Sequence, residues 1–111
     1  MNINFKEGVT PDKLKDITFR AIFACAKVFD SINQIPTITS THEGKHLPNS
    51  YHYIGQAFDI RTFRLHTTAI PRICERLTEE LHKISTDFQV IQEDTHIHIE
   101  FDNRNYQNEK I

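Results

Sequence analysis

Two stretches of the chain carry apolar residues at every third or fourth position, the spacing of a helix that packs on one side. The first covers residues 10–32 and opens with Thr10 and Pro11, a hydroxyl residue that can cap a helix and a proline suited to its first turn. The second covers residues 67–84 and places Pro71 in its first turn. The pattern therefore predicts two amphipathic helices.

Shorter stretches are typical of β-strands. Residues 35–40 are rich in β-branched side chains, and residues 57–62 alternate in polarity. Two further strands are predicted at residues 88–92 and 95–101, joined by an acidic turn that contains Glu93. The order of helix, strands, helix and hairpin predicts an α+β fold, in which a small antiparallel sheet is flanked by two main helices.

The last predicted strand has two unlike faces, because successive side chains of a strand point to opposite sides of the sheet. Ile97 and Ile99 fall on one face, whereas His96, His98 and Glu100 fall on the other. The isoleucine face is expected to pack on the core. The histidine face is expected to be polar.

Length and composition describe one ordinary globular domain, with 111 residues, 38% of them hydrophobic and 25% charged. We expect a single domain over residues 1–111, with a polar tail at residues 102–111. The net charge of −2 and the lack of a basic run argue against nucleic acid or anionic lipid as partners, and leave only a local patch open. There is no membrane-spanning stretch, and residues 1–9 lack the apolar segment of a signal peptide, so we expect synthesis in the cytoplasm.

Histidine is the unusual component of this chain, with 7 among 111 residues. His96 and His98 present two imidazoles on one strand face, and Asp59 points to one face of another strand. Between His52 and Asp59, Gly55 permits a tight backbone course that can bring His52 back over the strand. Two imidazoles and one carboxylate suit Zn²⁺ and leave a fourth position for water, as in catalytic rather than structural zinc sites.

These residues belong to a longer spaced pattern: Ser50, His52, Gly55, Ala57 and Asp59, followed downstream by His96 and His98. The pattern resembles the signature of the zinc D-alanyl-D-alanine carboxypeptidase and L-alanyl-D-glutamate endopeptidase family (peptidase family M15). That family shares its metal-site pattern with lysostaphin-type peptidases and the hedgehog signalling domain, so the resemblance implies a hedgehog/DD-peptidase-like fold. It covers residues 37–102, and the segment HIHIEFD looks most like phage-encoded members.

The resemblance implies a role for each matching residue. His52, Asp59 and His98 match the ligands of one zinc ion, and His96 matches a companion histidine near the developing oxyanion. Glu93 is the expected acid–base residue. Many relatives carry this carboxylate three residues before the last zinc-binding histidine, a spacing that fits Glu93 with His96 but not with His98. Either His98 binds zinc and Glu93 reaches in from the turn, or His96 binds zinc and the register shifts; we favour His98.

Substrate contacts are less well defined by the pattern. Ser50 and Tyr53 lie beside the first matching histidine and are candidate substrate-binding residues, although a tyrosine there can equally pack inside the fold. Relatives often carry an arginine in the segment matching residues 40–44, and this chain has none there. Arg61, on the same strand face as Asp59, is therefore a candidate for binding a substrate carboxylate.

The function implied by the resemblance is zinc-dependent hydrolysis of a peptide bond next to a D-amino acid in bacterial peptidoglycan stem peptides. Zinc lowers the pKa of bound water to about 7, and Glu93 would act as the base. The enzyme would be a carboxypeptidase or an endolysin-type endopeptidase. It would act on the bacterial cell wall, that of the host cell if the chain is phage-encoded. The bond cleaved and the oligomeric state do not follow from the sequence.

Two other functions stay open. A non-catalytic zinc-binding module can arise on the same ligand pattern, as the hedgehog domain illustrates. A histidine–hydrophobic–histidine strand also occurs in nucleases that nick single-stranded DNA through a tyrosine, for which Tyr106 is the available residue. The acidic balance of the chain and the place of Tyr106 in the polar tail argue against the nuclease.

Overall fold

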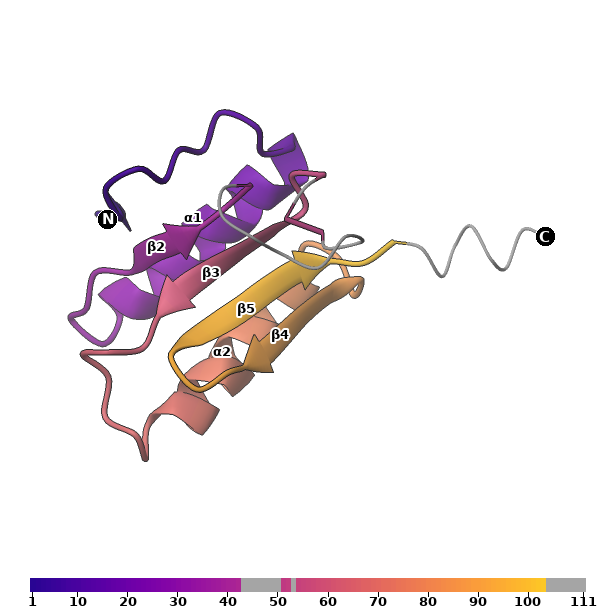
Figure 1. Ribbon diagram of the computed structural model, residues 1–111. Helices are drawn as coiled ribbons and strands as arrows, with labels where there is room; N and C mark the ends of the chain where they lie inside the picture. The colour runs from indigo at the N-terminus through magenta and orange to yellow at the C-terminus, as the bar shows by residue number, and fades with distance from the viewer. Residues whose placement is uncertain (43–50, 53, 104–111) are drawn as a thin grey trace.

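The computed structural model describes residues 1–42, 51–52 and 54–103, which form one five-stranded sheet and two helices. The strands lie side by side in the order β1-β2-β3-β5-β4, and both helices lie on the same side of the sheet (Figure 1). This arrangement confirms the α+β class. The elements are β1 (Asn4–Phe5), α1 (Asp16–Asp30), β2 (Thr37–Ser40), β3 (Ala57–Arg61), α2 (Ile70–His82), β4 (Phe88–Gln92) and β5 (His96–Phe101).

The sheet is mixed, and the expectation of a purely antiparallel sheet is wrong. β1 pairs in parallel with β2, with Asn4 opposite Thr37 and Phe5 opposite Ile38. The other three pairings are antiparallel. A strand of two residues is too short to show an alternation of polarity, and its partner is distant in the sequence, so the pattern along the chain carried no signal for it.

The first helix begins later than its pattern predicts. It starts at Asp16 rather than near Thr10, whose hydroxyl group donates a hydrogen bond to the Asp12 carboxylate 2.6 Å away. The backbone N–H of Lys15 donates to the carbonyl of Gly55 at 3.1 Å. The segment before the helix thus docks onto a distant turn, and the chain becomes helical only after that contact.

The remaining boundaries fall close to the predicted ones. α2 begins at Ile70, and Pro71 lies in its first turn as expected. The strand predicted at residues 88–92 is confirmed, and the one predicted at residues 95–101 begins at His96. Residues 104–111, which make up most of the predicted polar tail, lie outside the described residues. No helix in the described part of the chain is long and apolar enough to span a bilayer.

The hydrophobic core lies between the two helices and one face of the sheet. Ile97 and Ile99 of β5 are fully buried in it, whereas His96, His98 and Glu100 face the other side and are partly exposed. The predicted difference between the two faces of this strand is therefore confirmed. Among the described elements, no helix covers the second face, which is turned toward the viewer in Figure 1. This uncovered face carries the candidate site.

Candidate metal centre

Side chains from three segments meet on the uncovered face of the sheet. In the pairing of β3 with β5, Asp59 lies opposite His98 and Arg61 lies opposite His96, so these four residues share a face. His52 reaches the same point from the turn that precedes β3. One ligand atom each from His52, Asp59 and His98 lies within 4.8 Å of the other two. The structure thus brings together the three residues that the sequence singles out as metal ligands.

Gly55 shapes the turn that carries His52 to the sheet. Its φ of +73° is a conformation that side chains with a Cβ rarely adopt, and a Cβ there would lie 2.3 Å from the carbonyl oxygen of Lys13. Its N–H donates to the His52 carbonyl at 3.2 Å, and its own carbonyl accepts from the Thr18 hydroxyl group at 2.7 Å. The tight backbone course expected at this glycine is confirmed, and α1 fixes the turn in place.

The buried His52 ring is oriented by a backbone carbonyl. Its Nδ1 lies 2.5 Å from the carbonyl oxygen of Thr41, which can only accept, so Nδ1 carries the proton of the neutral ring. The lone pair of Nε2 then points at Asp59 Oδ1, 3.3 Å away. Two acceptor atoms that face each other require a cation between them, either a proton or a metal ion. A metal-ligating histidine commonly donates its other N–H to such a carbonyl.

Asp59 is the buried anion at the centre of the cluster. Burial acts to raise the pKa of its carboxyl group, but the interactions with the His52 and His98 rings outweigh that effect and hold the pKa well below its ordinary value. The Coulomb interaction with His96, whose Nε2 lies 3.8 Å from Asp59 Oδ2, lowers the pKa of Asp59 further. The carboxylate is therefore ionised throughout the neutral range, as a metal ligand must be.

His98 lies between two carboxylates. Its Nδ1 is 2.9 Å from Asp59 Oδ1, and its Nε2 is 2.8 Å from Glu100 Oε1. Burial acts to lower the pKa of the ring, yet the bonds to Asp59 and Glu100 outweigh it and raise the pKa above its ordinary value. If a metal replaces the Nδ1 proton, Glu100 still accepts from Nε2, which gives the carboxylate–histidine–metal arrangement of many metalloproteins.

The geometry favours His98 over His96 as the third ligand. His98 belongs to the group whose ligand atoms converge, whereas His96 contacts only the outer oxygen of Asp59 and keeps a third of its side chain exposed. The other ring nitrogen of His96 lies 3.2 Å from the hydroxyl group of Thr95. His96 thus stands beside the cluster, the place that the resemblance implies for a companion histidine.

The spacing of the three donors fits an ion such as Zn²⁺. Two ligand atoms about 2.0–2.2 Å from a tetrahedral ion are about 3.4 Å apart. The Oδ1 of Asp59 lies 3.3 Å from His52 and 2.9 Å from His98, so small movements would admit the ion. The two imidazole rings stand 5.0 Å apart at an angle of 57°, which leaves them free to converge on one point. These residues could hold a metal ion, whose identity the geometry leaves open.

Glu93 lies at the edge of this cluster rather than inside it. It follows β4, and its backbone N–H donates to the carbonyl of His96 at 2.9 Å. The hairpin register continues to place Glu93 opposite His96, on the histidine face of the sheet. Its side chain is exposed, and no hydrogen bond links its carboxylate to the cluster in the described residues. A role as base therefore requires the carboxylate to swing toward the metal position.

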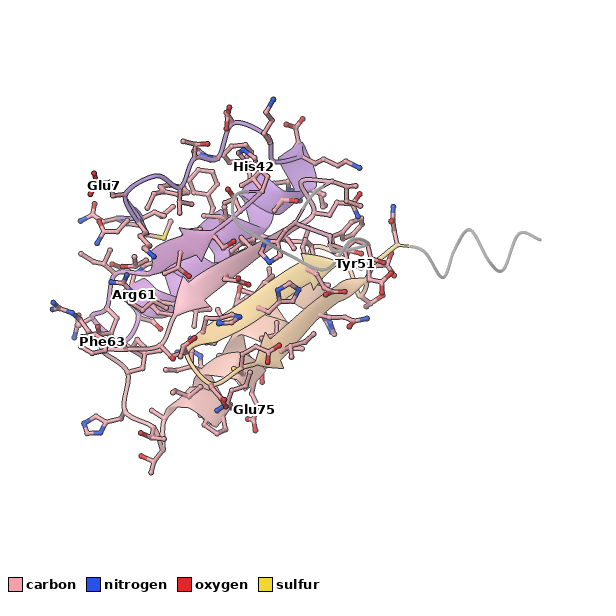
Figure 2. The ribbon with its side chains drawn as sticks, viewed as in Figure 1. Glu7, His42, Tyr51, Arg61, Phe63 and Glu75 are labelled. Carbon is pink, nitrogen blue, oxygen red and sulfur yellow. The ribbon has the colours of Figure 1, made fainter. Side chains whose placement is uncertain are left out.

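The three candidate substrate-binding residues differ in what the structure describes of them. Arg61 is exposed at the end of β3, on the site face (Figure 2). It lines a cavity of about 620 Å³ with Lys6 and Arg64. Ser50 and Tyr53 lie outside the described residues, as does Tyr106 of the nuclease hypothesis.

Two features that support the metal ligands cannot be predicted from the sequence. The first is the Thr41 carbonyl, which has no signature because every residue carries a carbonyl group. The second is an irregularity in β2, where Ile38 pairs with Ile60 but Ser40 pairs with Asp59, so the strand gains one residue beside the site. Such a bulge bends the strand and redirects the chain beyond it. Glu100, in contrast, was recognisable as a carboxylate two residues from His98 on the same face.

The chain matches no protein-family model. It also matches no curated protein.

Proposed function

We propose that the chain is a zinc-dependent metallopeptidase of the hedgehog/DD-peptidase type, related to peptidase family M15 and to its phage-encoded members. Its substrate would be a peptidoglycan stem peptide, cleaved at a bond next to a D-amino acid. The observation that carries the proposal is the convergence of His52, Asp59 and His98 on one side of a rigid sheet. Two imidazoles and one carboxylate are a donor set of catalytic zinc, which keeps a further position for water.

The residues around the ligands have distinct tasks in this proposal. When bound, zinc lowers the pKa of a coordinated water to about 7 and polarises a carbonyl group. Glu93 takes a proton from the attacking water and passes it to the leaving amine. The Nε2–H of His96 donates to the oxygen that gains negative charge, from a position 3.8 Å from Asp59. Glu100 and the Thr41 carbonyl hold the two ligating rings in place.

Substrate binding is assigned to the residues on either side of the ligands. Arg61 lies two residues beyond Asp59 on the same face of β3, at a distance that suits the carboxylate of an extended peptide. The resemblance also assigns Ser50 and Tyr53, which neighbour His52 in the sequence, to substrate binding. The site of action would be the bacterial cell wall.

The direct test is digestion of purified muropeptides by the zinc-loaded chain, with products identified by mass spectrometry. We expect a chelator to stop peptide release and added zinc to restore it. Glu93→Gln should lower turnover about a hundredfold to ten-thousandfold with zinc still bound. Asp94→Asn, a neutralised acid in the same exposed turn, is the matched control and should keep full activity.

The outcomes separate the proposal from its main alternative. If zinc binds but no muropeptide is cleaved, the chain is a non-catalytic zinc-binding module, which the exposed position of Glu93 would then explain. If cleavage occurs but Glu93→Gln retains full activity, the peptidase assignment stands and another group is the base.

A further inference from the structure

A second concave site lies on the other side of the sheet from the metal centre. A cavity of about 600 Å³ opens between the end of α1 and the start of α2. Its apolar lining includes Val28 and Ile32 of α1, Ile73 of α2 and Leu65 of the loop between β3 and α2. This volume lies within the range of about 300–1,000 Å³ that is usual for small-molecule sites.

The polar lining of this cavity is basic. Arg64, Arg72, Arg76 and His66 line it. Among the described residues, no carboxylate lines this cavity. Three of the six arginines of the chain line this one cavity, although the whole chain has a net charge of −2. The molecule therefore concentrates positive charge at one apolar hollow.

The three arginines differ in how they are held. Arg76 donates from Nη1 to the Ser31 hydroxyl group at 2.8 Å, which fixes its guanidinium group at the end of α1. Arg72 pairs with Glu75 at 2.9 Å and lies 4.0 Å from Glu79, but both contacts are exposed and such pairs are weak, so an incoming anion can compete for Arg72. Arg64 makes no hydrogen bond or ion pair within the described residues.

We propose that this cavity binds a small amphipathic anion, an alkyl or aryl group that carries a carboxylate or a phosphate. The apolar part would lie against Leu65 and Ile73, and the anionic group would contact Arg64 and Arg72. The first turn of α2 contains no acidic residue, so the helix dipole adds to the attraction. A concave site of this volume, lined by both apolar and basic side chains, favours a single small molecule over a bilayer surface. The site is independent of the metal centre.

The test is calorimetric titration with decyl phosphate and decanoate below their micelle concentrations. We expect both to bind the chain with one-to-one stoichiometry, and decanol and inorganic phosphate to bind at least about tenfold more weakly, because each lacks one half of the recognised chemistry. Equal binding of decanol or of inorganic phosphate would overturn the proposal. So would binding only to vesicles that contain an anionic lipid, since the occupant would then be a membrane.

Variants locate the site. Arg64→Gln combined with Arg72→Gln should weaken decyl phosphate binding about tenfold or more. Arg20→Gln removes an exposed arginine of α1 outside the cavity and should leave binding unchanged. Ala69→Phe, which enlarges a side chain that lines the cavity, should also weaken binding. The far-UV circular dichroism spectrum and the unfolding midpoint of all of these variants should match those of the parent chain, which shows that they fold. Equal losses in the double variant and in Arg20→Gln would contradict the assignment.

Discussion

Asp59 is the residue on which the candidate centre depends most. It is buried, it stays ionised because His52 and His98 offset its burial, and it lies within 3.3 Å of both rings. Without this carboxylate, the two histidines would have no charged ligand between them, and only Glu100, on the far nitrogen of His98, would help to balance a dication. The side chain therefore supplies both a ligand atom and the charge that makes the site attractive to a metal ion.

The first prediction concerns this carboxylate. Asp59→Asn keeps the shape of the buried side chain but removes its charge. We therefore expect zinc affinity to fall more than about a hundredfold, which exceeds the loss that is usual when a residue that only orients a ligand is changed. Competition with a chromogenic chelator measures the change. Asp94→Asn should bind zinc as the parent chain does. Unchanged affinity in Asp59→Asn would remove Asp59 from the centre.

Glu100 is predicted to act through His98. Glu100→Gln replaces a charged acceptor of the Nε2 proton by an amide, and zinc affinity should fall about 10–100-fold while the fold persists. Glu75→Gln, on the exposed side of α2, provides the control. The same titration measures both variants, and equal affinities would show that Glu100 is merely a neighbour of the ring.

Zinc binding should also depend on pH through His98. The pKa of this ring is raised, so below that pKa a proton occupies Nδ1 and must leave before a metal binds. Apparent affinity should therefore rise with pH up to the raised pKa and then level off, with a change of about tenfold per pH unit below it. Titrations from pH 5.5 to 8.5 test this. Glu100→Gln should shift the rise to lower pH, because it removes one cause of the raised pKa.

At the scale of elements, the turn before β3 connects the site to α1. Gly55 has a φ of +73°, and its backbone lies directly against Lys13, so a side chain there would meet both strain and a clash. Its carbonyl accepts from Lys15 and Thr18 at the start of the helix. The position of His52 thus depends on where α1 begins, although the helix contributes no ligand.

Two glycine substitutions distinguish the effect of backbone strain from the effect of a steric clash. Gly55→Ala should lower the free energy of unfolding by about 3 kcal/mol or more and weaken zinc binding, since it displaces the turn that holds His52. Gly8→Ala has a similar φ of +85° but open space around its Cβ, so it should cost only about 1 kcal/mol and leave zinc affinity intact. Chemical denaturation and metal titration compare the two, and equal effects would mean that the contact with Lys13 is unimportant.

The same elements show which features of the fold can be predicted from the sequence and which cannot. The alternation in β5 placed His96 and His98 on one face correctly, because burying Ile97 and Ile99 fixes the register of a strand. The start of α1 was misplaced because it depends on a hydrogen bond from Lys15 to a turn far along the chain. Local pattern carries no information on such contacts. For the same reason the bulge in β2 and the Thr41 carbonyl became visible only in the folded structure.

In the whole molecule, the sheet separates two sites of different chemical character. The face without helices carries imidazoles and carboxylates, while the other face packs on α1 and α2 (Figure 1). These two helices frame the arginine-lined cavity. The sequence pattern indicated the first site because its residues follow a recognisable spacing. The cavity depends on how two helices and a loop pack together, which periodicity does not specify.

The metal centre requires that His52, Asp59 and His98 bind one ion together and leave a position open. X-ray absorption spectroscopy of the chain loaded with one equivalent of zinc observes these ligands. We expect about four nitrogen or oxygen neighbours at about 2.0–2.1 Å, the scattering of two imidazoles, and no sulfur, with loss of the bound zinc in Asp59→Asn. A sulfur neighbour, a third or fourth imidazole, or no stoichiometric binding at all would contradict it.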